Sequence, residues 1–407
     1  MEELDLFHPD TFAEVLYARM VEVNPGIEEM ELYEFRYALN NLFPEEGGWA
    51  SVGPDDRAEI EALIASKDFY TAIQIKPRVG DRIVFDEAIV RLTNMLFVGL
   101  VTGEYGVEWV RAHFYFDIRG FYFLPRTRYF TGEVVAHLGG GPLFTFERRQ
   151  QRFDRWQSIG YKAFREANAE VDQAFIQAVH RLVEVKGTPI VLAIAGPTAA
   201  GKTEIVARLR GSFEEAGRRV TSIEMDNFLT DRDYREEKGI HTLGKEAIHF
   251  ELFKEGLEAI CRGEKITIPR YDFVYATSSH DLDGALKPGG VPIEVEPADV
   301  IFIEGNFPFL LEQVAHRIGI KVVYLTDDDV RMKRKWKRDI DYRKKYEPTY
   351  FRNRYFRNQF LMAEKCYRPQ MCLCDLVVDT TGAAIWATPE MARILIQGGK
   401  EQRCPGC

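Results

Sequence analysis

The sequence has no apolar run near the ~20 residues that a membrane-spanning helix requires. Its first residues, Met-Glu-Glu-Leu-Asp, also lack the basic and apolar regions of a secretory signal peptide. These absences predict a cytoplasmic protein. Cysteine is scarce, with six in 407 residues, and disulfides are not expected in that compartment. No Asn-Lys-x-Asp segment occurs, which argues against a guanine-reading GTPase switch.

Positive charge is also in short supply, because the formal net charge is -10, and this argues against a general nucleic-acid binder. The charge is unevenly distributed along the chain. Residues 1–63 hold sixteen acidic and three basic side chains, whereas residues 331–345 hold nine basic and two acidic ones. A basic segment in an acidic protein indicates a site for a small anion, although a solvated basic helix face would have the same composition.

Four of the six cysteines lie in the last 36 residues. Cys372-x-Cys374 and Cys404-x-x-Cys407 could together supply four thiolates to a tetrahedral zinc ion. We favour the alternative that these cysteines bind no metal. Cys374 precedes the apolar segment 376–379 and would be a small core residue, while the second pair lies on a polar tail.

The most informative stretch is residues 189–210, where an apolar segment leads into a glycine-rich turn and then into a segment with helical periodicity. Gly196 and Gly201 bracket four residues and precede Lys202 and Thr203, which is the spacing of a phosphate-binding loop. In such a loop, backbone N–H groups at a helix N-terminus surround a phosphate chain. Lys202 would reach the β- and γ-phosphates, and the Thr203 hydroxyl would bind Mg²⁺. The predicted nucleotide-binding residues are Gly196, Pro197, Thr198, Ala199, Ala200, Gly201, Lys202 and Thr203.

From about residue 188 onward, strand-like apolar segments alternate with helical ones, a pattern typical of a parallel sheet covered on both faces. We expect an α/β fold of the P-loop NTPase type. The expected strands are 190–195, 219–225, 300–304, 321–325 and 375–379. The expected helices are 202–216, 246–262, 309–316, 328–344 and 350–367.

The preceding part of the chain predicts an α+β domain of unknown role. Thr11-x-x-Glu14 has the form of a capping box, so helices are expected from residue 11 to about 24, at 28–42 and after Pro54. Aromatic and β-branched runs predict a core sheet with strands at 71–75, 82–85, 113–118, 121–124, 132–137 and 143–146, and a helix near 87–99. A helix at 154–184 would connect the domains. The predicted division is residues 1–186, 187–399 and a cysteine-containing tail, 400–407.

Two acidic residues follow predicted strands, Asp226 after 219–225 and Glu304 at the end of 300–304. Ligands of a parallel α/β sheet bind outside the carboxyl ends of its strands, so both acids should lie beside the phosphate-binding loop. One carboxylate can accept the proton of an attacking hydroxyl, and a second can hold Mg²⁺ directly or through water. We assign Asp226 as the base, close to the metal, and Glu304 as the metal partner. An N-cap or turn role is the alternative for either acid.

With these residues in place, the chain resembles the phosphoribulokinase and uridine kinase family. The matching segments occur in family order across residues 188 to about 380. They are the loop from Gly196 to Thr203, Met225-Asp226-Asn-Phe228, Ile268-Pro-Arg-Tyr271-Asp272-Phe273, Ala298-Asp-Val-Ile-Phe-Ile-Glu304-Gly305, Asp327-Asp-Asp-Val-Arg331 and Arg334-x-x-x-Arg338-Asp339.

The resemblance implies ATP- and Mg²⁺-dependent phosphorylation of a hydroxyl on a small molecule. It places Tyr271 and Asp272 beside the substrate and makes the basic helix a lid over the phosphates. Arg334 and Arg338 are four residues apart and therefore share one helix face, as such a lid requires. The catalytic candidates are Lys202, Asp226, Arg334 and Arg338, and the substrate-binding candidates are Tyr271, Asp272 and Arg343.

The chain also departs from the uridine kinase pattern. Leu229 stands where uridine kinases carry a tyrosine, and residues 242–245 (Thr-Leu-Gly-Lys) replace a Phe-Asp-His-Pro-like segment. Ala276 lies near the place of a family histidine, and the nearest histidine is His280. In the family these residues hold the ribose and the pyrimidine, so the resemblance implies kinase chemistry more strongly than it implies uridine specificity.

The sequence therefore predicts an ATP-dependent kinase for a nucleoside-, sugar- or polyol-like metabolite. A kinase for a sugar phosphate, glycerate or pantothenate is one alternative, and a regulatory protein that senses nucleotide on a kinase fold is another. Intact Lys202, Thr203, Asp226 and Glu304 favour an enzyme, because a sensor needs no base. The expected partners are ATP and a small hydroxyl-bearing substrate, with neither nucleic acid nor a membrane, and a homo-oligomer is left open.

Overall fold

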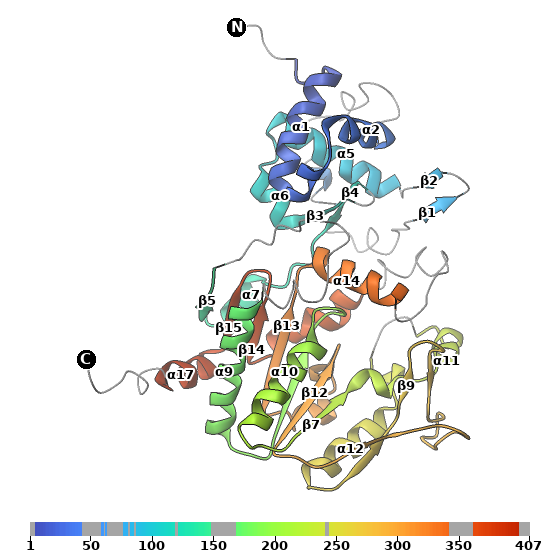
Figure 1. Ribbon diagram of the computed structural model, residues 1–407, viewed down its shortest axis with the longest axis vertical. Coiled ribbons are helices and arrows are strands. Elements are labelled where there is room, and N and C mark those ends of the chain that lie inside the picture. Colours follow the sequence, from blue (N-terminus) through green and yellow to red (C-terminus); the bar gives the residue numbers. More distant parts are fainter. Residues whose placement is uncertain are drawn as a thin grey trace, which may run out of the picture. The chain divides into compact units, whose positions relative to one another are not determined.

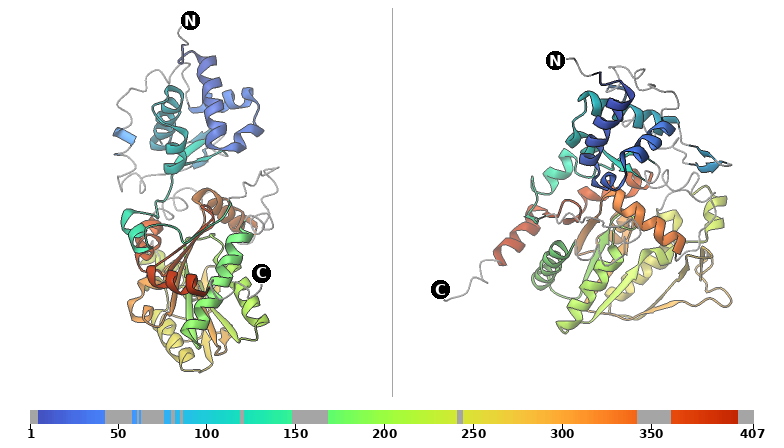
Figure 2. Two further views of the ribbon diagram at one scale, coloured as in Figure 1. Left: turned by 90° about the vertical axis from the view of Figure 1, so that its left-hand side faces the viewer. Right: turned by 45° about the horizontal axis from the view of Figure 1, so that its top comes forward.

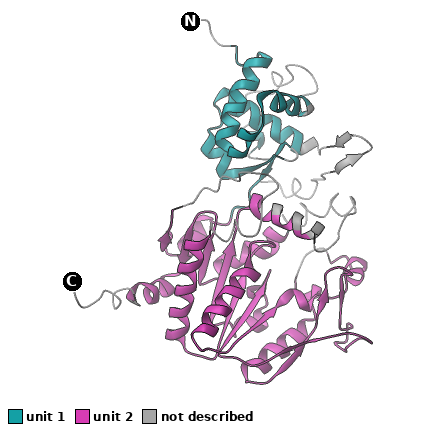
Figure 3. Ribbon diagram, in the orientation of Figure 1, with its two compact units in different colours: residues 1–128, 346–361 teal, residues 129–345, 362–407 magenta. Residues whose placement is uncertain are grey.

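The computed structural model describes residues 5–42, 58–60, 62, 76–79, 82–84, 87–118, 121–147, 168–240, 244–341 and 361–398. The chain forms two compact units, one of residues 1–128 and 346–361 and one of residues 129–345 and 362–407 (Figure 3). The units divide at residue 128, earlier in the chain than the predicted boundary at residue 186. The predicted domain boundary at residue 186 and the separate tail, 400–407, stay predictions.

The first unit combines helices with two-stranded antiparallel sheets. Phe97, Phe116 and Phe123 are almost fully buried, and their ring centroids lie 5.0 to 6.0 Å apart. These aromatic side chains form a core, as the sequence predicts. The elements are α1 (Pro9–Val23), the 3₁₀ helix η1 (Pro25–Glu29), α2 (Leu32–Leu42), β1 (Lys76–Val79), β2 (Arg82–Val84), α5 (Glu87–Thr102), α6 (Val107–His113), β3 (Phe114–Asp117) and β4 (Tyr122–Pro125).

The first two helices differ from their predicted bounds. Helix α1 begins at Pro9 and not at the predicted capping box, because the fixed φ of proline suits the first helical position. The predicted helix at 28–42 is divided into η1 and α2, which are separated by a short extended segment at Met30. The strand expected at 71–75 lies outside the described residues, as does most of the helix expected after Pro54.

The segment predicted as a strand at 132–137 is instead a short helix, α7 (Gly132–His137). The Thr131 side chain accepts a hydrogen bond from the Val134 N–H and so caps the first turn. Val134 and Leu138 are buried in the second unit's core while Ala136 between them is exposed, a pattern that suits a helix and not a strand. Local capping and helical spacing therefore outweigh the β-branched Val-Val pair.

A seven-stranded sheet forms the centre of the second unit, in the order β5-β15-β14-β13-β6-β12-β7 (Figure 1). Strands β14, β13, β6, β12 and β7 are parallel, and they confirm the five predicted strands to within one residue at each end. Strands β15 and β5 complete one edge in antiparallel fashion. The bounds are β5 (Phe144–Thr145), β6 (Ile190–Ala195), β7 (Val220–Glu224), β12 (Val300–Gly305), β13 (Ile320–Leu325), β14 (Leu376–Asp379) and β15 (Ala384–Ala387).

Alternate side chains of the central strand β6 enter two separate cores, one on each face of the sheet. Leu192 and Ile194 pack with α9 (Ala169–Lys186), α10 (Lys202–Glu215) and α17 (Pro389–Gly398). Helix α17 lies beside α9 in Figures 1 and 2. Val191 and Ala193 pack instead with α7, α12 (Phe250–Cys261) and α13 (Glu312–Ala315). The fold is therefore the predicted α/β sheet with helices on both faces.

Three predicted helices of this unit have different bounds. Helix α12 begins at Phe250, because Ile248 forms a bridge with Leu229. The segment 309–316 is divided, and of the helix expected at 350–367 only residues from 361 on are described. The remaining elements are η4 (Met225–Phe228), α11 (Arg232–Glu237), η5 (Lys245–Ala247), β8 (Ile266–Ile268), β9 (Tyr271–Asp272), β10 (Thr277–Ser278), β11 (Ile293–Val295), η6 (Pro308–Leu310), α14 (Asp328–Asp341), the π-helix η7 (Ala363–Tyr367) and η8 (Pro369–Cys372).

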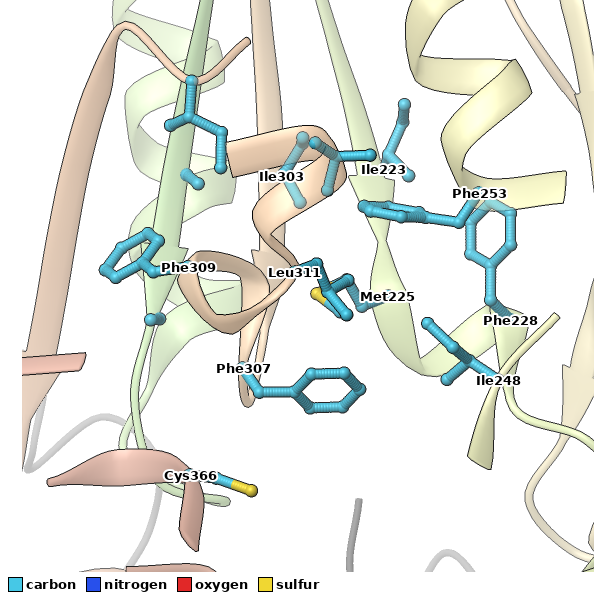
Figure 4. Packing of buried hydrophobic residues seen from close by; sticks show 14 of the residues in the cluster. Ile223, Met225, Phe228, Ile248, Phe253, Ile303, Phe307, Phe309, Leu311 and Cys366 are labelled. Carbon is cyan, nitrogen blue, oxygen red and sulfur yellow. The ribbon is translucent and has the colours of Figure 1, made fainter. Parts of the chain in front are cut away.

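The core extends to the carboxyl ends of the strands, where it supports the connecting segments. Phe228 of η4 packs edge-on against Phe253 of α12, with ring centroids 5.1 Å apart (Figure 4). Cys374 is buried and its thiol donates to Met371 O, so it is the core residue that was expected. Cys404 and Cys407 lie outside the described residues. Among the helices described, none is both long and apolar enough to cross a membrane.

Candidate active site

The glycine-rich loop connects β6 directly to α10 at the carboxyl end of the sheet. Its backbone turns through positive φ values at Gly196 (152°), Ala199 (62°) and Gly201 (107°). A Cβ atom on Gly196 would lie 2.3 Å from the carbonyl oxygen of Tyr324 in the neighbouring strand β13. Only glycine fits there, because both the backbone conformation and the space exclude a side chain.

Lys202 is half-buried at the start of α10 and folds back over the loop. Its Nζ donates to Gly196 O at 2.9 Å and to Pro197 O at 3.0 Å. Burial lowers the pKa of Lys202 to about 8, although Glu304 and Asp226 act in the opposite direction. The ammonium therefore lies over the loop, and among the described residues its hydrogen-bond acceptors are these two neutral carbonyl groups.

Glu304 is the penultimate residue of strand β12 and lies beside the first turn of α10. Its Oε1 accepts a hydrogen bond from the Thr203 hydroxyl at 2.7 Å. The carboxyl is only 7% exposed, and burial raises its pKa to about 7, partly offset by Lys202 and by the Thr203 hydrogen bond. The second oxygen, Oε2, is buried and has no hydrogen-bond partner among the described residues. A buried, unsatisfied carboxylate oxygen of this kind fits a site that binds a cation or an ordered water.

Asp226 lies in η4, directly after β7. It accepts a hydrogen bond from Asn306, a residue that is not among the site residues predicted from the sequence. Asn306 Nδ2 donates to Asp226 Oδ1 at 3.2 Å, and Asn306 is itself buried. The fully buried Gln370 donates from Nε2 to the Asn306 carbonyl at 2.8 Å and accepts from the Phe309 N–H at 3.1 Å. Asn306 could have been found from its place just beyond a strand that ends in Glu304. Gln370 has no such signal.

The basic helix α14 brings its predicted arginines to the loop. Arg334 Nη1 donates to Ala200 O at 3.3 Å, and Arg338 Nη2 donates to the Thr198 hydroxyl at 3.1 Å. Burial lowers the pKa of Arg334 to about 10. Arg343 lies outside the described residues. Lys202, Arg334 and Arg338 therefore surround the loop with positive charge, as a site for an anionic phosphate chain requires.

The two predicted substrate residues of β9 have different surroundings. The Tyr271 backbone N–H donates to Asn227 Oδ1 at 3.3 Å, which joins β9 to the residue after Asp226. The buried Tyr271 hydroxyl accepts from Arg235 Nη2 at 2.9 Å. Asp272 is exposed, and its Oδ1 accepts from the backbone of residues 274 and 275, which stabilises its own turn. Arg235 carried no signal in the sequence.

The segment after Tyr271 contains Ala276, near the place of a family histidine, and the nearest histidine, His280. His280 is buried and its Nδ1 lies 2.9 Å from Ser279 Oγ. Asp281 Oδ1 accepts from the backbone of residues 283 and 285. Ala276 is buried with φ 61°, and Leu243 lies outside the described residues. Both His280 and Asp281 form these hydrogen bonds within their own segment.

The oxygen donors around Glu304 fit Mg²⁺ better than a transition metal, because carboxylate and hydroxyl oxygens are the ligands that hard cations prefer. They are Thr203 and Glu304, with Asp226 close enough to Lys202 to influence its pKa. No group of three or more His, Cys, Asp or Glu side chains among the described residues could hold a metal by itself.

Comparison with known proteins agrees with this geometry. The model of the "Phosphoribulokinase / Uridine kinase family" matches residues 191–384. The uridine kinase of Brevibacillus brevis is 30% identical over 160 residues, which cover 39% of this chain and 69% of that protein. The chain belongs to this family. The family domain contains the loop, both predicted acids and the basic helix, and no family is assigned to the N-terminal region.

Other relatives of the family domain are similarly distant. The uridine kinase of Lactobacillus helveticus is 26% identical over 197 residues, 48% of this chain and 88% of that protein. The chain spans 62% of the length of the Halobacterium salinarum uridine kinase, at 30% identity over 152 residues, 37% of this chain. A solved structure of a possible uridine kinase from Bacillus stearothermophilus has a TM-score of 0.37 at 18% identity and covers 52% of this chain and 98% of that one. A D-glycerate 3-kinase from Cryptococcus neoformans has a TM-score of 0.38 at 15% identity, covering 53% and 97%.

The raised pKa of Glu304 in the family domain predicts a pH-dependent cost to stability. Burial raises this pKa from 4.5 to about 7, so the folded chain holds the proton more tightly than the unfolded chain does. Glu304 therefore lowers the free energy of unfolding as pH rises through that interval. Glu304→Gln removes the titration, so its stability relative to wild type should be higher at pH 8 than at pH 5, by roughly 1–3 kcal/mol.

Urea unfolding of both proteins at the two pH values, without nucleotide, measures this difference. Glu215→Gln, which changes an exposed acid at the end of α10, is the control and should show no comparable effect of pH. A Glu304→Gln variant whose relative stability is the same at pH 5 and pH 8 would contradict the account of this carboxyl.

Proposed function

We propose that the chain is an ATP- and Mg²⁺-dependent phosphotransferase that acts on a hydroxyl of a small sugar- or polyol-like metabolite, with nucleosides as poor acceptors. The observation that carries this proposal is the meeting of the glycine loop, the Glu304–Thr203 pair and the Asp226–Asn306 pair at one end of the sheet. Membership of the family supports nucleotide binding and phosphoryl transfer. The acceptor is the finer part of the proposal.

In this mechanism the loop binds the phosphates of ATP through its backbone N–H groups. Lys202 exchanges its bonds to Gly196 O and Pro197 O for bonds to the β- and γ-phosphate oxygens. Arg334 and Arg338 add charge-assisted hydrogen bonds from α14, where negative charge is shared by the transferred phosphoryl group and the leaving oxygen. These cations stabilise the transition state more than the ground state where their hydrogen bonds strengthen as negative charge develops on the leaving oxygen.

Asp226 accepts the proton of the acceptor hydroxyl as the oxygen attacks the γ-phosphorus. Its bond to Asn306 Nδ2 fixes one carboxylate oxygen and leaves the other for the substrate. Gln370 donates a hydrogen bond to the Asn306 carbonyl, so it positions Asp226 indirectly, through Asn306. Thr203 and Glu304 would hold Mg²⁺, which when bound neutralises phosphate charge and orients the phosphate oxygens.

The rival from another class is a protein that senses nucleotide and transfers nothing. A sensor needs the loop and Lys202, but it gains nothing from a carboxylate held in place by a buried asparagine and glutamine. The Asp226–Asn306–Gln370 chain of contacts therefore favours the enzyme. An assay for ADP distinguishes the enzyme from the sensor. The enzyme forms ADP when an acceptor is added, and the sensor does not.

Lys202→Ala should lower turnover by on the order of 10²-fold or more, because it removes the ammonium that contacts the transferred group. The fold should persist, since removal of this half-buried charge relieves the desolvation cost that lowers its pKa. Turnover and thermal unfolding are measured on the same preparation, with Lys254→Ala on α12 as the control. A Lys202→Ala variant with near wild-type turnover would contradict the role of Lys202 in phosphoryl transfer.

Asp226→Asn should lower turnover by roughly 10²- to 10⁴-fold, the usual contribution of a general base, while ATP affinity changes much less. The amide keeps the shape of the side chain and loses the proton acceptor. Asn306→Ala should reduce turnover by a smaller factor with the same pattern, because it only frees the carboxylate to move. Calorimetric ATP binding and steady-state kinetics separate the effects, and an equal collapse of ATP binding would mean that Asp226 acts mainly on the metal.

Uridine and cytidine should be poor acceptors, because Ala276, Leu229 and Leu243 lack the polar groups by which uridine kinases read a nucleoside. Polar contacts that a site is built to satisfy provide discrimination on the order of 10⁴-fold. A panel of nucleosides, pentose phosphates, glycerate, pantothenate and inositols, scored by ADP release, measures the preference. The highest kcat/KM for uridine would show that the missing contacts are replaced from elsewhere and that this prediction is wrong.

A further inference from the structure

Two arginines beside Tyr271 form no ion pair with a carboxylate within the described part of the chain. Arg235 Nη2 donates to the Tyr271 hydroxyl at 2.9 Å, and the Arg235 guanidinium carbon lies 5.6 Å from the centroid of the Tyr271 ring. Arg232 is one turn earlier on helix α11, and no ion pair of the described residues involves either arginine. Both cations act on Tyr271, because they partly offset the rise that burial causes in its pKa.

One acid that adjoins these arginines in the sequence, Asp231, is paired with a lysine. Both carboxylate oxygens of Asp231 accept from Lys287 Nζ, at 3.0 and 2.7 Å, and Oδ1 also accepts from the Ser278 N–H at 2.7 Å. The ion pair with Lys287 reduces the effect of the Asp231 charge on its surroundings. The charges that act on the Tyr271 hydroxyl are two arginines and this one paired carboxylate.

Arg235 is also connected to the proposed base. Its guanidinium donates a hydrogen bond to the Tyr271 hydroxyl. The Tyr271 backbone N–H in turn donates to the side chain of Asn227, the residue that follows Asp226. The guanidinium is restrained by a hydrogen bond and by the face of an aromatic ring, which reduces the conformational entropy it would lose on binding a ligand. A planar guanidinium fixed in this way matches the two oxygens of a carboxylate or phosphate group.

We propose that the acceptor carries an anionic group, a phosphate or a carboxylate, which Arg235 binds with the assistance of Arg232 while the hydroxyl faces Asp226. This inference rests on the proposed kinase activity and names the class of its acceptor. Tyr271 acts here as a positioning residue for Arg235. The charge of the acceptor then replaces the nucleoside contacts that the chain lacks.

Matched pairs of acceptors that differ in one anionic group test this directly: ribose and ribose 5-phosphate, glycerol and glycerate, and uridine and UMP. The wild-type chain should prefer the anionic member of a pair. Arg235→Gln should lower kcat/KM for that member by about 10- to 100-fold, mainly through KM, and leave the neutral member unchanged. The pairs distinguish a phosphate from a carboxylate as the group that is read.

Arg262→Gln is the control, because this exposed arginine pairs with Glu264 at the end of α12 and should affect neither member. The proposal is overturned if no anionic acceptor is preferred over its neutral partner. It is also overturned if Arg235→Gln lowers kcat/KM equally for both members of a pair.

A second readout does not depend on turnover. With the nucleotide site filled by Mg²⁺ and an unreactive ATP analogue, inorganic phosphate is titrated as the probe by calorimetry. Wild type and Arg262→Gln should bind one phosphate equally, and Arg235→Gln should bind it at least ~10-fold more weakly. Phosphate binding that Arg235→Gln leaves unchanged, or no binding at all, overturns the anion subsite. Phosphate binding at Arg235 in a chain that never forms ADP would instead contradict the kinase proposal alone.

Discussion

The close backbone approach of Gly196 to Tyr324 determines where the phosphate-binding loop can lie. Strand β13 pairs with β6 up to the start of the loop, and the Tyr324 carbonyl occupies the space that a Cβ on Gly196 would need. Tyr324 is fixed in turn, because its hydroxyl donates to Asp172 of α9 at 2.7 Å, and Asp172 also accepts from Arg208 of α10. Burial raises the pKa of Asp172, and both hydrogen bonds favour its ionised form. The loop thus depends on a buried polar connection between two helices and one strand.

The charged side chains beside the loop, Lys202 and Glu304, are placed there at a cost to the stability of the fold. Lys202 has a lowered pKa and Glu304 a raised one, both because burial disfavours their charged forms. A protein selected for stability alone would have no reason to bury this pair, and perturbed ionisable groups of this kind gather at functional sites. A ligand that brought opposite charges to these two groups would stabilise their charged forms, and its binding would then be coupled to the stability of the unit.

The parts of this architecture that depend on local sequence could be predicted. The apolar runs and glycine spacing of the β6 segment and the loop predict their own structure, and strand ends in a parallel sheet bring Asp226 and Glu304 to the same edge. Contacts between distant segments could not be predicted in this way. Asn306 meets Asp226, and Gln370 meets Asn306 across 64 positions, only because β12, η4 and η8 converge. Helix α7 was missed because two valines favoured a strand while a threonine cap and burial of one side decided for a helix.

The most direct test of the loop is the affinity of Gly196→Ala for Mg²⁺-ATP, measured by calorimetry alongside thermal unfolding. A side chain at φ 152° and 2.3 Å from a backbone oxygen forces the loop to move, so affinity should fall by roughly 10-fold or more while the domain stays folded. Gly211→Ala within α10 is the matched control, because open space surrounds a Cβ there and affinity should not change. A Gly196→Ala variant that binds Mg²⁺-ATP as tightly as wild type would contradict the assignment of this loop as the nucleotide site.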